Sequence, residues 1–158
     1  MFGWFRSASR DRRKKVRFDR KHLEERARRF LKNYLEADET RKPQFYRAVE
    51  DVSKKCHPVE IGLSRTDVDD ARIAETTSQA AVQMVLDRTN RIKENDRVGN
   101  FVTDACASVA VAYHRAAGIY VGDEEMQELG TAAVHLLTMA TSYTNAHKEE
   151  EGGSKANS

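Results

Sequence analysis

The sequence predicts an all-α protein, a compact bundle of about five helices preceded by a flexible basic N-terminal arm. Only two prolines and eight glycines occur among the 158 residues, whereas β-sandwiches and barrels need many turn residues. Apolar side chains recur at spacings of three and four in five segments, as on one face of a helix. Apolar residues make up 39% of the chain, which suffices for one core in one domain.

The first helix is expected from about Asp19, a favourable N-cap, to Ala37. Its apolar stripe consists of residues spaced three and four apart, namely Leu23, Ala27, Phe30, Leu31, Tyr34 and Leu35. The opposite face is expected to be basic, because it carries Arg26, Arg28, Arg29 and Lys32. This face would extend the positive charge of the arm.

The second helix is expected to begin near Pro43, because a proline in the first turn costs no hydrogen bond. Its buried side is formed by Phe45, Tyr46, Val49 and Val52. The segment from Thr66 to Asp69 resembles a capping box and starts the third helix, which is expected to run to about Glu94.

The fourth helix is expected after residues 95–97 and ends near Gly118. Its small residues allow neighbouring backbones to approach closely, which predicts the most enclosed helix: Ala105, Ala107, Ala110, Ala112, Ala116 and Ala117. The fifth helix is expected to begin at the cap Asp123, followed by an apolar seam of Met126, Leu129, Ala133, Leu136, Ala140 and Tyr143. The fourth and fifth helices are expected to form the centre, with Val109 and Leu136 buried.

Three segments are therefore expected: an aromatic and basic arm over 1–18, a helical bundle over 19–147, and a polar disordered tail over 148–158. Residues 1–33 contain 13 Lys or Arg and 4 Asp or Glu, a net charge of +9, and the remaining residues carry a net charge of −7. A basic arm on an acidic body suggests an anionic partner for the arm. The alternative is that the arm is merely solvated or folds back onto the acidic body.

The arm combines aromatic rings with positive charge, and its candidate binding residues are Phe2, Trp4, Phe5, Arg6, Arg10, Arg12, Arg13, Lys14, Lys15, Arg17, Arg20 and Lys21. Rings placed ahead of the cations favour a membrane surface, where the rings enter the headgroup region and the cations meet anionic lipid. The alternative is nucleic acid, with the arm and the first helix on phosphates. A protein partner that binds the arm as a docking peptide is a further alternative.

Two short patterns in the arm resemble regulatory motifs. Arg6 stands three residues before Ser9, which resembles a basophilic kinase site and makes Ser9 a candidate phosphosite. The segment from Lys15 to Phe18 resembles the docking motif of regulators of the type-one protein phosphatase. Both patterns cover four residues and arise easily in basic tails.

The sequence carries no catalytic signature, so no catalytic residue, metal ligand or cofactor is predicted. No two histidines stand four residues apart, and no phosphate-binding glycine motif occurs. The acids at helix starts are explained by capping, and His114-Arg115 is expected at a helix edge. Cys56 and Cys106 are expected as reduced thiols, and no signal peptide or membrane span is expected. The predicted location is the cytoplasm, with a peripheral position at the inner face of a membrane; the oligomeric state stays open.

Overall fold

The computed structural model describes residues 19–57 and 71–157, with side chains as far as His147. Within these residues there is no strand, and the elements are five helices: α2 (Arg20–Glu36), α3 (Lys42–Cys56), α4 (Ala71–Thr89), α5 (Arg97–Ala116) and α6 (Glu124–Asn157). The prediction of an all-α bundle of about five helices is confirmed. The expected arm at 1–18 and the expected capping box at 66–69 lie outside the described residues.

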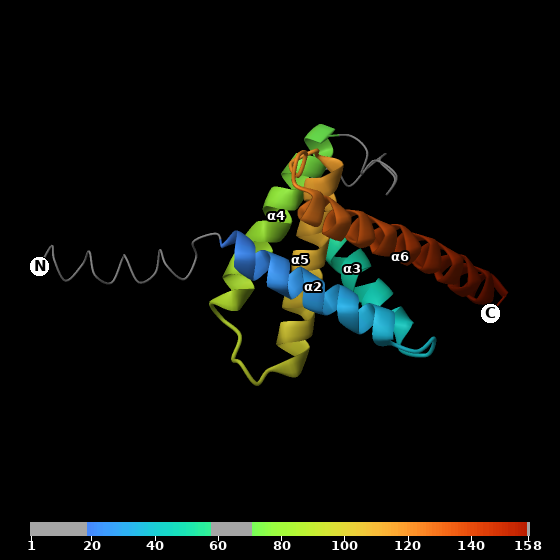
Figure 1. The fold of residues 1–158 in the computed structure, drawn as a ribbon. Helices are drawn as coiled ribbons and strands as arrows, with labels where there is room; N and C mark the ends of the chain where they lie inside the picture. The colour runs from blue at the N-terminus through green and yellow to red at the C-terminus, as the bar shows by residue number, and fades with distance from the viewer. Residues whose placement is uncertain (1–18, 58–70, 158) are drawn as a thin grey trace, which may run out of the picture.

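Helix α5 lies at the centre of the bundle, where it contacts α2, α3, α4 and α6. Figure 1 shows α4 and α5 side by side, with α2 crossing α5. The close approach is possible because small side chains form much of the α5 surface, among them Ala105, Ala107, Ala110 and Ala112, all fully buried. Val109 and Leu136 are each 1% exposed. The predicted centre, formed by the helices that contain these two residues, is confirmed.

Three aromatic rings join α2, α3 and α5. The ring centroids of Phe30 and Phe45 are 5.2 Å apart, and Phe101 lies 5.3 Å from Phe30 and 5.2 Å from Phe45. Phe30 and Phe45 are nearly inaccessible to solvent, so these contacts belong to the core. They hold α2 and α3 against the first half of α5.

The helix starts follow the local signals in the sequence. The Asp19 carboxylate accepts hydrogen bonds from the backbone N–H groups of Lys21 and His22, as expected of an N-cap. Pro43 lies in the first turn of α3. The Asp123 carboxylate accepts from Met126 N–H at 3.2 Å at the start of α6.

Two helix ends differ from the prediction. Helix α4 ends at Thr89, not near Glu94. In the loop that follows, the Asn100 side chain at the start of α5 donates to the carbonyls of Lys93, Glu94 and Asp96 and holds 93–96 against that helix start.

Helix α6 continues to Asn157, so residues 148–157, expected as part of a disordered tail, are helical. The polar composition of these residues indicates only that their side chains are not needed in the core. Polar composition does not decide whether the backbone is helical. A residue added to the end of an existing helix gains a backbone hydrogen bond without a new nucleation step.

Candidate functional site

A glycine turn at the end of α5 shapes the candidate site. Gly118 has φ +78°, a left-handed conformation that a side chain disfavours. Gly118 N–H donates to Arg115 O at 3.1 Å, and Ile119 N–H donates to His114 O at 3.0 Å. This pair of bonds is a Schellman motif, which ends the helix and reverses the chain. The reversal places Ile119 and Tyr120 back against the last turn of α5.

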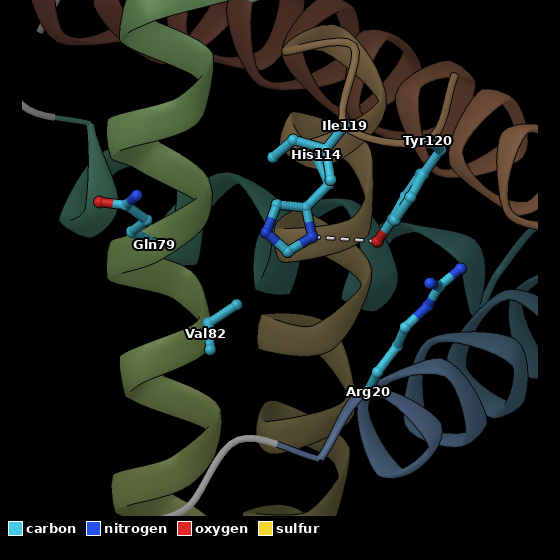
Figure 2. Close-up of a pocket in the computed structure, with 6 residues that line it drawn as sticks. All are labelled: Arg20, Gln79, Val82, His114, Ile119 and Tyr120. Atoms are coloured by element: carbon cyan, nitrogen blue, oxygen red, sulfur yellow. Dashed lines mark hydrogen bonds between the residues drawn. The ribbon is translucent and has the colours of Figure 1, made fainter. Parts of the chain in front are cut away.

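These residues line an open pocket of about 340 Å³ beside the start of α2. Its lining comes from four segments and is mostly apolar: Arg20, Gln79, Val82, His114, Ile119 and Tyr120. Figure 2 shows the His114 imidazole and the Tyr120 ring between α4 on one side and Arg20 on the other. A pocket of this size and polarity is suited to an apolar group with a few polar contacts.

A polar pair, half-buried His114 and buried Tyr120, forms the inner wall of the pocket. His114 Nδ1 and Tyr120 Oη lie 3.0 Å apart and share a hydrogen bond, drawn as a dashed line in Figure 2. Burial, and to a smaller extent the nearby Arg20 charge, lower the pKa of His114 to about 4. Burial also raises the pKa of Tyr120 to about 12. Both groups are therefore neutral at physiological pH, which preserves the apolar character of the wall.

A charged pair lies at the rim of the same pocket. Arg20 forms an ion pair with Asp123, and its guanidinium carbon lies 5.7 Å from the centre of the Tyr120 ring. The Met126 N–H bond and Arg20 hold the pKa of Asp123 below its usual value. The rim thus links the first turn of α2 to the start of α6.

A second cluster corrects the expected basic face of the first helix at one position, Arg26, whereas Arg28, Arg29 and Lys32 are exposed as expected. Arg26 is buried, and its Nη1 donates to Asp104 Oδ1 at 2.8 Å. Arg29 Nε and Nη2 donate to the two Asp104 oxygens at 2.7 and 2.8 Å. Arg26 Nε also donates to His22 Nε2 at 2.9 Å, and burial together with Arg26 lowers the pKa of His22. Arg26 therefore faces α5 and not solvent.

All four arginines of α2 are ion-paired within the chain. Arg28 pairs with Glu24 at 2.8 Å and with Glu125 at 3.6 Å, in addition to the pairs made by Arg20, Arg26 and Arg29. Lys32 is exposed on the same helix. Much of the positive charge that the sequence assigns to this helix is thus compensated by carboxylates of the body.

Only two of the predicted binding residues lie within the described part of the chain. Arg20 is in the pocket rim, and Lys21 is exposed in the first turn of α2. The other candidates, including the Ser9 phosphosite, lie outside the described residues: Phe2, Trp4, Phe5, Arg6, Arg10, Arg12, Arg13, Lys14, Lys15 and Arg17.

Neither the Asp104 cluster nor the pocket is among the features expected from the sequence. A usable signal for the cluster existed, because Asp104 is a lone carboxylate among small and apolar residues of a helix that was expected to be enclosed. A buried carboxylate requires a cation, and the arginines of the first helix were available. For the pocket, no comparable pattern exists in any one segment.

Among residues 19–57 and 71–157, no helix combines the length and apolar character needed to cross a membrane, and no group of three or more His, Cys, Asp or Glu is placed to hold a metal ion. Comparison with protein-family models, with curated proteins and with solved structures finds no match for this chain.

Proposed function

We propose that this protein is a non-enzymatic helical adaptor whose first 18 residues bind an anionic membrane surface. One observation carries the proposal: every arginine of α2 is already paired with a carboxylate of the same chain. Residues 1–18, with seven Lys or Arg against one Asp, are thus the segment with the largest excess of positive charge. The same segment holds Phe2, Trp4 and Phe5.

Rings and cations are complementary on such a surface. Burial of one aromatic ring in the headgroup region contributes about 2 kcal/mol, and a cation near anionic lipid contributes about 1 kcal/mol. Neither the rings alone nor the cations alone suffice, because part of the binding free energy offsets the conformational entropy lost when residues 1–18 become ordered. Their combination supports reversible attachment of the bundle to the membrane.

The charge pairs also weigh against the nucleic-acid alternative. That alternative requires the first helix to place arginines on phosphates. Contact with phosphate would require Arg26 to leave its buried bond with Asp104, and Arg20 and Arg28 to exchange their own carboxylates for phosphate. The membrane proposal requires no such exchange, because its contacts lie in residues 1–18.

Flotation with vesicles tests the proposal through matched variants. Lys14→Ala with Lys15→Ala removes two lysines from the segment, whereas Lys54→Ala with Lys55→Ala removes two exposed lysines at the end of α3. At about 1 kcal/mol per cation, the first pair weakens binding to anionic vesicles about 30-fold. The second pair leaves binding unchanged, and neutral vesicles bind neither the native protein nor the variants.

The rings are tested separately by replacing Phe2, Trp4 and Phe5 with Ser. We expect this variant to leave anionic vesicles even at low salt. If it still floats, the membrane proposal is wrong. If the ring variant also keeps its affinity for duplex DNA or RNA while the lysine variant loses that affinity, nucleic acid is the partner.

A further inference from the structure

We propose that Trp4 of the chain's own N-terminal segment docks in the pocket beside Arg20, and that this closed state competes with the membrane for the ring. The docking is independent of the function proposed above. The competition rests on that function, and the experiments below separate the two.

The pocket offers apolar surface to a ring. Ile119 is 50% exposed although it lines the pocket, and Val82 on α4 is half-buried. Figure 2 shows both side chains on the pocket side of their segments, with the His114 and Tyr120 rings beside them. An indole buries more apolar area than a phenyl ring and favours edge contacts with other rings, so Trp4 suits this lining best of the three aromatics.

Chain connectivity brings the ring to the pocket. Arg20, at the rim, is the second residue after the segment 1–18, and Trp4 precedes Arg20 by 16 residues. Sixteen residues span at most roughly 55 Å, far more than is needed to return to the rim. A ligand tethered by a short linker has an effective concentration in the millimolar range, so even weak docking is populated.

Charge complementarity favours the same occupant. The pocket rim continues into the acidic start of α6, where Asp123 is followed by Glu124 and Glu125. The Glu125 side chain is 80% exposed, and Glu124 and Glu128 line a neighbouring groove. All seven cations of residues 1–18 follow Trp4 in the sequence, and so lie between the ring and the α2 rim. The rim itself holds Arg20 with its partner Asp123, and the acidic start of α6 lies beyond it, so the surroundings of the apolar pocket suit an aromatic residue that is followed by cations.

Docking and membrane binding exclude each other, since one ring cannot occupy both places. Anionic vesicles would draw Trp4 and its neighbouring cations out of the pocket. The apparent affinity for vesicles is then reduced by the fraction of molecules in the open state. The pocket thereby acts as a built-in restraint on membrane attachment.

Trp4 is the one tryptophan of the chain, so its fluorescence reports its own environment. In the full chain without lipid, we expect blue-shifted emission and poor quenching by acrylamide. Ile119→Ser and Val82→Ser remove apolar surface from the pocket and should shift the emission to the red and raise quenching several-fold. The matched control is Val121→Ser in the same turn, because Val121 is 79% exposed and does not line the pocket.

Three results would overturn the docking proposal. The first is that acrylamide quenches Trp4 fluorescence in the native protein as readily as in the protein unfolded in urea. Another is equal quenching in the Ile119→Ser, Val82→Ser and Val121→Ser proteins, with circular dichroism showing that all three are helical. The third is quenching that falls as protein concentration rises, because the ring would then occupy a second copy.

Vesicle binding tests the competition. Ile119→Ser should bind anionic vesicles several-fold more tightly than the native protein, and Val121→Ser should not. Equal vesicle affinity despite altered fluorescence overturns the competition and leaves the docking standing. If no variant binds vesicles, the proposed function fails, while the fluorescence result still decides the docking.

Discussion

Replacement of Asp104 by leucine is expected to destabilise the protein by about 3–5 kcal/mol. The side chains of Asp104 and Arg26 are only 7% and 8% exposed, so the change leaves a guanidinium in the core without its carboxylate. Arg29 also loses two bonds, but its side chain is 54% exposed and water replaces them. That loss contributes about 1 kcal/mol at most.

A double-mutant cycle tests the origin of this penalty. Arg26→Met alone removes the buried cation and leaves Asp104 paired with Arg29, so it should be milder than Asp104→Leu. The combination of Arg26→Met with Asp104→Leu replaces the pair by apolar side chains and should recover most of the lost stability. Urea denaturation followed by circular dichroism measures all four proteins.

The exposed partner provides the control. Arg29→Ala should cost no more than about 1 kcal/mol, since its side chain is 54% exposed. If Asp104→Leu costs as little as Arg29→Ala, Arg26 is not a buried partner of Asp104. If the double variant is as unstable as the sum of the single variants, the two side chains are not coupled.

Leu136→Ala should lower the free energy of unfolding in urea by about 2–5 kcal/mol, because Leu136 is 1% exposed at the centre. Glu128→Ala, on the exposed face of α6, should lower it little, and equal losses in the two variants would contradict the packing. Gly118→Ala should cost about 1–2 kcal/mol in the same assay, since φ is +78° there, and no loss would argue against the turn. The pKa of His114 is about 4 when folded, below its usual value near 6.5, so the unfolded chain binds the proton first and stability falls as the pH drops from about 6.5 toward 4. His114→Gln should remove about 2–3 kcal/mol of the stability loss between pH 7 and pH 4.5, and identical pH profiles would show that folding does not lower the pKa of His114.

The order and starts of the described helices could be predicted because their causes are local. The Asp19 and Asp123 carboxylates cap backbone groups within three residues of themselves, and Pro43 acts within its own turn. The apolar stripe of α2 follows from the spacing of its own residues, and Phe30 is indeed in the core. Each of these effects is contained in a window of a few residues.

The sequence by itself therefore determined the all-helical fold, the order of the described helices, where most of them begin and most of the apolar side of each, although Leu35 of the predicted stripe is 71% exposed and residues 148–157 are helical. Only the tertiary structure decided that Arg26 lies inside, because its partner Asp104 is 78 residues away. It likewise decided that four separate segments line the open pocket. Periodicity describes how side chains are arranged around a single helix. These features depend on which other helix packs against it and which side chains that helix places at the contact.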